Sequence, residues 1–211
     1  MRTALASRCA IVLALAACSG CGGAGGGAGT ARTENRSVAA TSDHRVAVPP
    51  AHASIVLPDG WADVRSLSAE QRDRLQRAED SFPPLAKGVE LFRENPASTF
   101  LAADFRDLRS FLNILVLPAP PGFTLADLRE QFVSRLVRTA VGRAEVRSVT
   151  FAAGPALYVR SCHRLTGQIY CARQYLFVHR RMTVFMIFTS GSARTSRLSE
   201  DAKAIAASLA F

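Results

Sequence analysis

The sequence predicts an α+β fold in which helices cover an antiparallel β-sheet. Strand patterns bracketed by helical patterns extend over residues 54–211, and tight turns join most of the strands. The run from Met182 to Phe188 is apolar at both alternating positions, which is typical of a central strand buried on two faces. We therefore expect this run to lie inside the sheet.

The first half of this region alternates turn signals with helix signals. Pro58-Asp59-Gly60 is a typical turn after a short strand, and Trp61, the only tryptophan, is expected to anchor the core. Ser68 and Gln71 form a capping box that starts a helix, and Pro83-Pro84 ends this helix and starts another. The predicted elements are a strand at 55–57, helices at 68–80 and 83–92, and strands at 99–105 and 111–117.

The second half is predicted to be mostly sheet between two helices. Thr124 caps a helix whose apolar residues recur at helical spacing. Gly154 and the dipeptide Thr166-Gly167 are turn signals between long strand patterns. The predicted elements are a helix at 124–137, strands at 146–151, 155–165, 168–179 and 182–189, and a helix from about Thr195 towards Phe211.

An export signal precedes the predicted domain. Arg2 and Arg8 come before a short apolar run at 10–17, which is too short to span a bilayer as a helix. Leu15-Ala16-Ala17-Cys18 resembles the lipobox of bacterial lipoproteins. This resemblance implies that the chain is cut before Cys18 and that Cys18 carries a lipid such as palmitate. The alternative is an ordinary signal peptide that is cleaved in the same region.

The predicted organisation has three parts. Residues 1–17 are the signal peptide, residues 18–53 are a lipidated and disordered tether, and residues 54–211 are the globular domain. The tether prediction depends on a glycine-rich run at 20–29 and on the absence of any apolar period before Ser54.

The chain is basic, with a formal net charge of +9 that falls to +7 when Arg2 and Arg8 leave with the signal. An exported protein does not ordinarily meet nucleic acid. The charge therefore indicates anionic lipid headgroups or envelope polymers as partners, in addition to the membrane that holds the lipid anchor. The alternative is a basic surface that merely follows from an arginine-rich genome.

Cys162 and Cys171 are predicted to form a disulfide. If Thr166-Gly167 is a two-residue hairpin loop, each cysteine lies four residues beyond the loop and the two face one another. Counting outward places them at a non-hydrogen-bonded pair, where α-carbons approach to about 4.5 Å. A bridge closing so short a loop should contribute about 2–3 kcal/mol. The alternatives are a reduced pair or a two-ligand metal site, which would lack further ligands.

The same register predicts an anion-attracting surface. It places Arg160 opposite Arg173 and Tyr158 opposite Tyr175 on one face, with Arg164 beyond the disulfide. Directly opposed arginines repel unless solvent or an anion screens them. Arginine also suits bidentate recognition of phosphate or carboxylate. The alternative is a pair of exposed arginines that extend into water.

The sequence predicts no enzyme, no cofactor and no metal site. It lacks the G-x-S-x-G elbow, H-E-x-x-H, the P-loop and G-x-G-x-x-G. His163 and His179 fall on predicted strands or at a hairpin end, without a nucleophile or carboxylate nearby in sequence. An envelope hydrolase with a site assembled from distant residues is the remaining enzymatic alternative.

Several segments of residues 54–211 occur together in one known protein family. They are Leu57-Pro58-Asp59-Gly60-Trp61, the strand at 111–117 with Asn113, the proline-rich turn before Thr124, Gly154-Pro155-Ala156, Gln174-Tyr175-Leu176-Phe177-Val178 and Ile205-Ala206-Ala207-Ser208-Leu209-Ala210-Phe211. In this set and order the chain resembles the LpqN-type actinobacterial lipoproteins of the PsbP-like α/β/α sandwich superfamily. The resemblance implies a binding or assembly role and no shared catalytic residue.

The expected function is that of a lipid-anchored, non-catalytic binding or assembly module at the extracytoplasmic face of the cell membrane. Its partner would be an envelope protein or an anionic envelope component. The alternative is a carrier for a small lipid or glycan, which would need a deep apolar cavity between the sheet and a helical layer.

Overall fold

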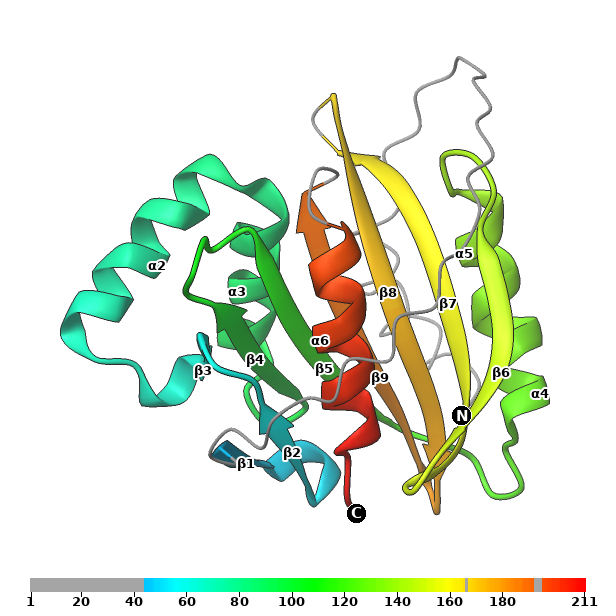
Figure 1. Cartoon of the computed structure of the whole chain (residues 1–211). Coiled ribbons are helices and arrows are strands. Elements are labelled where there is room, and N and C mark those ends of the chain that lie inside the picture. Colours follow the sequence, from blue (N-terminus) through cyan, green and yellow to red (C-terminus); the bar gives the residue numbers. More distant parts are fainter. Residues whose placement is uncertain (1–43, 166, 192–194) are drawn as a thin grey trace, which may run out of the picture.

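A seven-stranded antiparallel sheet is the framework of the fold (Figure 1). The computed structural model describes residues 44–165, 167–191 and 195–211. The strand order is β3-β4-β5-β9-β8-β7-β6, so β9 is central, and the α+β prediction is confirmed. The strands are β3 (Trp61–Asp63), β4 (Thr99–Asp104), β5 (Ser110–Pro118), β6 (Glu145–Phe151), β7 (Gly154–Leu165), β8 (Gln168–His179) and β9 (Met182–Gly191), and a separate small sheet pairs β1 (His44–Val48) with β2 (Ala53–Leu57).

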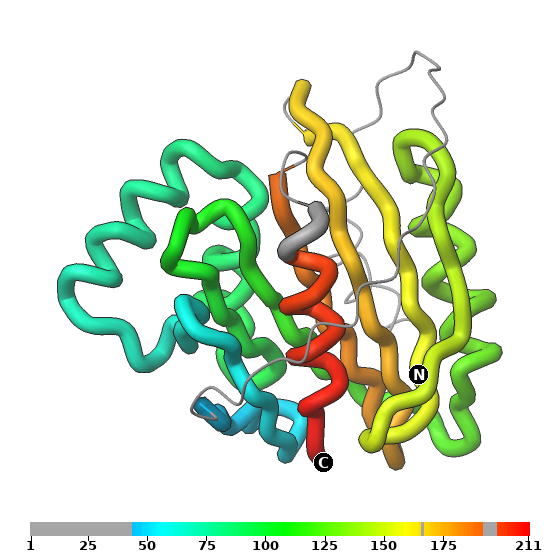
Figure 2. The backbone as a smooth tube through the Cα atoms, in the orientation of Figure 1, coloured from blue at the N-terminus to red at the C-terminus, as the bar shows by residue number. Residues whose placement is uncertain are grey.

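Helices cover both faces of the sheet (Figures 1 and 2). The red helix α6 runs along one face, and the helical segment from α4 to α5 packs on the other face. None of the helices in the described ranges has the length and apolarity that a membrane crossing requires. The helices are α2 (Ala69–Ser81), α3 (Pro83–Glu94), α4 (Leu125–Leu128), α5 (Ser134–Arg138) and α6 (Thr195–Ala207), with a π-helical segment η3 (Arg129–Val133) between α4 and α5 and short 3-10 turns η1 (Pro49–Ala51) and η2 (Val64–Ser66).

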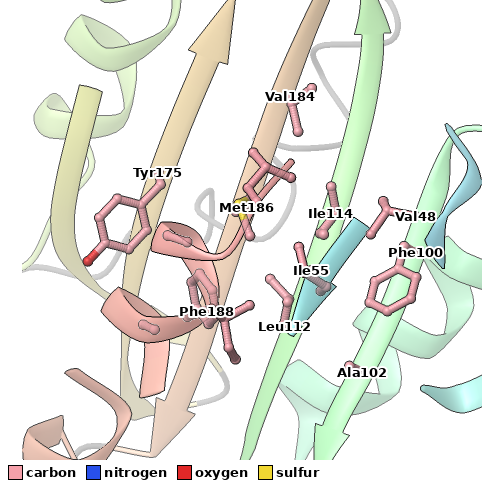
Figure 3. Close-up of a cluster of buried hydrophobic side chains, with 14 of the residues drawn as sticks. Val48, Ile55, Phe100, Ala102, Leu112, Ile114, Tyr175, Val184, Met186 and Phe188 are labelled. Carbon is pink, nitrogen blue, oxygen red and sulfur yellow. The ribbon is translucent and has the colours of Figure 1, made fainter. Parts of the chain in front are cut away.

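Successive side chains of β5 point to opposite faces of the sheet, so its buried apolar residues belong to separate cores. Leu112 and Ile114 face α6, and Figure 3 shows them beside side chains from β1, β2, β4 and β9. Leu115 faces the α4–α5 segment, and Phe111 faces α2 and α3. Burial of alternate residues on two faces is what holds the helical layers to the sheet.

The domain begins earlier than the predicted boundary at residue 54. Strand β1 pairs with β2, and Val48 at its end has no exposed surface and belongs to the core beneath α6. The prediction of a disordered tether is therefore wrong for residues 44–53. Pro49-Pro50 begins η1, which reverses the chain between the two strands. A strand of five residues followed by two prolines is too short to produce a clear sequence period.

The two predicted helix starts at Ser68 and Thr124 are present, and the helix that begins after Thr124 is interrupted. Ser68 Oγ accepts a hydrogen bond from the Gln71 N–H at 3.2 Å, and Thr124 forms a similar capping box with Asp127. The helix predicted for 124–137 contains the π-helical segment η3, in which the consecutive residues Phe132 and Val133 are both buried. A π turn changes which side chains face the sheet, and a regular 3.6-residue period does not predict it.

A polar network ties α6 to the far edge of the sheet. Trp61 Nε1 on β3 donates to Asp201 Oδ2 on α6 at 2.9 Å, and Arg106 Nη2 donates to the same oxygen at 2.7 Å. Arg106 Nε also donates to Asp104 Oδ1 at 2.6 Å. Trp61 is 5% exposed, so it has the anchoring position expected for it.

Candidate functional site

The hairpin of β7 and β8 has the predicted register. Cys162 lies opposite Cys171, and the two sulfur atoms are joined at 2.07 Å in a disulfide. Leu165 pairs with Gln168 nearest the turn. The other predicted pairs are Tyr158 with Tyr175 and Arg160 with Arg173.

The five residues of the predicted anion-attracting face differ in exposure. Arg160 is exposed, and Arg164 is half-buried with Nη1 donating to the Gly167 carbonyl at 3.3 Å. Tyr158, Arg173 and Tyr175 are only 4–5% exposed. The tyrosines therefore do not frame an open surface, and the candidate site is centred on arginines.

Aromatic packing explains why the tyrosines are buried. The Tyr158 and Tyr175 rings lie 5.3 Å apart, and Phe151 and Phe188 pack on Tyr175 at 5.4 and 6.1 Å. In Figure 3 the Tyr175 hydroxyl points away from the other labelled side chains. Burial raises the pKa of this hydroxyl from 10 to about 12, which reflects its position among apolar rings.

Arg173 is the most unusual charged residue of this face. Its Nε and Nη1 atoms are buried and have no hydrogen-bond partner in the described part of the chain. Burial lowers the pKa of the guanidinium, and the opposed Arg160 lowers it further, whereas Tyr158 partly offsets both effects. Tyr158 also forms a side-chain hydrogen bond with the guanidinium. The structure therefore places a cation inside the fold with fewer acceptors than such a group normally finds.

Strand β6 contributes two charged residues that the sequence prediction missed. Glu145 lies opposite Arg160, and Arg147 lies opposite Tyr158. The Arg147 guanidinium lies 4.5 Å from the Tyr158 ring centroid, and its Nε donates to Glu145 Oε1 at 3.0 Å. Counting outward from a two-residue loop at Ala152-Ala153 would have shown this pairing. Arg147, Arg160 and Arg173 are called the arginine cluster below.

A small cleft lies on the opposite face, between α3 and α5. Pro84 and Leu136 form its sides, Gln174 and Ile187 lie in its floor, and its volume is about 50 Å³. The Gln174 Oε1 atom is buried there without a hydrogen-bond partner among the described residues. This volume accommodates a few water molecules, whereas pockets for drug-sized ligands have volumes of about 300–1,000 Å³. The cleft therefore gives no support to the carrier alternative.

Asn113 shows how closely α3 packs beside this cleft. It lies in the same row as Gln174, with Ile187 of β9 between them. A Cβ on Gly88 of α3 would come within 2.7 Å of Asn113 Nδ2 and 2.9 Å of a Phe111 ring carbon. Only glycine permits this approach of the helix to the sheet.

The buried histidine of the chain is fully engaged by its neighbours. His163 Nδ1 lies 3.2 Å from the Thr139 carbonyl oxygen, and Nε2 lies 2.9 Å from Ser161 Oγ. Because a carbonyl oxygen only accepts, Nδ1 carries the proton and Nε2 accepts from the serine hydroxyl. Within the described residues, no group of three or more His, Cys, Asp or Glu side chains could hold a metal ion.

His163 should make stability depend on pH. Burial lowers its pKa from 6.5 in spite of the hydrogen bond to Thr139, so the unfolded chain binds the proton more readily. The stability that neutral His163 provides is present above pH 6.5 and is lost as the pH falls below it. We expect the loss of unfolding free energy on acidification to be smaller in His163→Gln. Urea titrations at a series of pH values, with the exposed His44→Gln as control, measure this. Equal pH slopes for wild type and His163→Gln would contradict it.

Comparisons with known proteins support the fold. No family model matches the chain, and no curated protein matches its sequence. Among solved structures, the Ran-binding protein Mog1p of Saccharomyces cerevisiae is similar with a TM-score of 0.50 and 11% identity, over 81% of this chain and 96% of that chain. A likeness at this identity shows the fold alone. It agrees with the α/β/α sandwich predicted for residues 54–211.

Three further structures resemble the chain more weakly. LpqN of Mycobacterium tuberculosis, described as involved in cell envelope biogenesis, has a TM-score of 0.46 at 9% identity, over 74% of this chain and 81% of that chain. The PsbP protein of Synechocystis has a TM-score of 0.40 at 13% identity, over 85% and 98%. A Bacteroides thetaiotaomicron protein has a TM-score of 0.48 at 11% identity, and the match covers 79% of this chain and 47% of that longer protein.

Proposed function

We propose that this protein is an exported lipoprotein of the LpqN type that acts as a non-catalytic binding or assembly module of the cell envelope. Its lipid on Cys18 would hold it at the extracytoplasmic face of the membrane. Cys18 lies outside the described residues, so this part of the proposal depends on the lipobox-like Leu15-Ala16-Ala17-Cys18 and the apolar run before it. The LpqN type is supported by the sequence segments that resemble that family.

The observation that carries the binding role is the arginine cluster. Among the described helices, α6 lies on this face in front of β9 and its neighbours, and it leaves β6 and much of β7 uncovered (Figure 1). Arg160 is exposed there, and the Arg147 side chain is 57% exposed. Among the described strand neighbours of the cluster, Glu145 is the one carboxylate. Such a surface of guanidinium groups favours an anionic partner such as a lipid headgroup, an envelope polymer or an acidic protein.

A binding role is also in keeping with the fold. Mog1p, which has this fold, is a Ran-binding protein. Both ring nitrogens of His163 are held by Thr139 and Ser161, so this buried histidine serves packing and hydrogen bonding.

Cys18→Ala should release the protein from membranes or leave it with an uncleaved signal. Two acyl chains give stable attachment where one is marginal, because each buried methylene contributes about 0.8 kcal/mol. Fractionation of cells and detection of labelled palmitate on the protein measure the effect. Cys21→Ala is the matched control, since it removes the neighbouring cysteine of the glycine-rich segment and should leave attachment unchanged. Normal processing and membrane retention of Cys18→Ala would contradict the anchoring proposal.

A further inference from the structure

Arg173 is a buried cation whose hydrogen-bonding capacity is incomplete. It is 4% exposed, and both Nε and Nη1 lack a partner in the part of the chain that the structure describes. A buried charge is strongly unfavourable unless a counter-charge and acceptors accompany it. Tyr158 forms a side-chain hydrogen bond with the guanidinium, but the charge and the two nitrogens are only partly compensated. Arg173 is therefore a candidate contact for an anion.

The strand neighbours of Arg173 increase this need. Arg160 on β7 lies directly opposite, and opposed side chains have Cβ atoms about 5 Å apart. Phe188 on β9, the neighbour on the other side, is apolar. Glu145 pairs with Arg160 from β6, two strands away from Arg173, and its carboxylate accepts a hydrogen bond from Arg147. Glu145 is thus placed to compensate Arg147 and Arg160 rather than Arg173.

A second buried polar side chain near Arg173, that of Ser190, also lacks a hydrogen-bond partner among the described residues. Ser190 on β9 lies opposite Cys171 of β8. Because Cys171 is two residues before Arg173, Ser190 and Arg173 lie on the same face of the sheet. Ser190 has no exposed surface, and its Oγ atom has no hydrogen-bond partner within the described residues. Diagonal neighbours on one face are about 7–8 Å apart, so this hydroxyl lies near Arg173, on the side of β8 away from Arg160.

We infer that the arginine cluster binds a phosphate group between Arg160 and Arg173, with the Ser190 hydroxyl as a further donor. This inference deepens the proposed binding function by naming the chemistry of the ligand. Arginine forms short, charge-assisted hydrogen bonds to phosphate, and two guanidinium groups that repel one another become favourable when an anion bridges them. A phosphate offers more acceptor oxygens and up to two negative charges, so it suits this cluster better than a carboxylate.

The direct test follows the arginine side chains during a phosphate titration. The three cores lie within residues 44–211, so the chain from residue 19, produced without acylation, retains the fold. Sodium phosphate is added at constant ionic strength to ¹⁵N-labelled protein, and the arginine Nε–Hε resonances and the melting temperature are measured. We expect the Arg173 resonance, assigned by its loss in Arg173→Met, to move downfield and the melting temperature to rise. Sodium acetate should have a much smaller effect.

Two variants separate a specific site from general charge. Arg160→Met changes an exposed residue, and Arg173→Met removes the buried charge. Each should weaken phosphate binding at least about tenfold, the effect of one lost charge-assisted contact. Arg135→Met, an exposed arginine on α5 on the opposite face, removes the same charge and should bind phosphate like wild type. Without phosphate, Arg173→Met should melt at the same temperature as wild type or higher.

Vesicles distinguish a lipid headgroup from a free phosphate. One outcome is binding to phosphatidic acid vesicles but not to phosphatidylcholine vesicles, with this binding lost in Arg160→Met. It would identify the phosphate monoester of a lipid headgroup as the ligand. Phosphate binding without vesicle binding would identify a soluble phosphorylated ligand. No movement of the Arg173 resonance in excess phosphate, or equal effects of phosphate and acetate, would overturn the inference. Either result together with release of Cys18→Ala from membranes would leave the anchoring proposal intact.

Discussion

Asp201→Ala is expected to lower the free energy of unfolding by about 2–4 kcal/mol, because two hydrogen bonds to one charged oxygen are lost together. Asp201 Oδ2 accepts from Trp61 Nε1 and from Arg106 Nη2. Without it, the indole N–H of a tryptophan that is 5% exposed has no acceptor. Arg106 retains Asp104, so part of the network survives. We expect the lower stability to result from a weaker contact between α6 and the β3 edge of the sheet.

Urea denaturation followed by tryptophan fluorescence measures this effect, since the only tryptophan lies in the network. Glu200→Ala is the matched control. Glu200 is the exposed neighbour of Asp201 on α6, and its replacement should change stability by no more than about 0.5 kcal/mol. Asp201→Asn should lie between the two, because an amide oxygen can still accept from Trp61. Equal midpoints for Asp201→Ala and Glu200→Ala would show that the network contributes little.

Removal of the disulfide is expected to cost about 2–3 kcal/mol of unfolding free energy. Cys162 and Cys171 are nine residues apart, so the bridge restricts only a short loop of the unfolded chain. Replacing both cysteines by alanine should therefore leave the fold intact and shift the urea midpoint. Hydrogen exchange should increase towards Leu165 and Gln168, while the backbone around Tyr158 and Tyr175 remains protected by its aromatic neighbours.

The reduced wild-type protein provides the control for this experiment. It should unfold at the same urea concentration as the double alanine variant, because both lack the cross-link. Peptide mapping without reductant should recover the two cysteines as one linked pair. Free thiols that are trapped by an alkylating agent before denaturation would rule the bridge out, and an unchanged midpoint in the double variant would show that it adds no stability.

Strand pairing within hairpins could be predicted by counting from a loop. The register of β7 and β8 follows from two loop positions, so the Cys162–Cys171 and Arg160–Arg173 pairs were correct. The capping boxes at Ser68 and Thr124 were also correct, since each depends on side chains three residues apart. Strand β1 was missed, because a strand of five residues gives no clear period. The burial of Val48 at its end depends on distant parts of the chain, including α6.

The candidate site illustrates the same division between local and long-range effects. Turn chemistry and alternation are properties of neighbouring residues, and they were sufficient to place Arg160 and Arg173 opposite one another on one face. Their different exposure depends on the order of strands across the sheet. Arg173 lies on β8, which borders the central strand β9 and contacts α6, whereas Arg160 lies on β7 beside the edge strand β6. Two residues of the same type thus have different environments, because burial is set by which segments pack around each strand, and those segments come from distant parts of the chain.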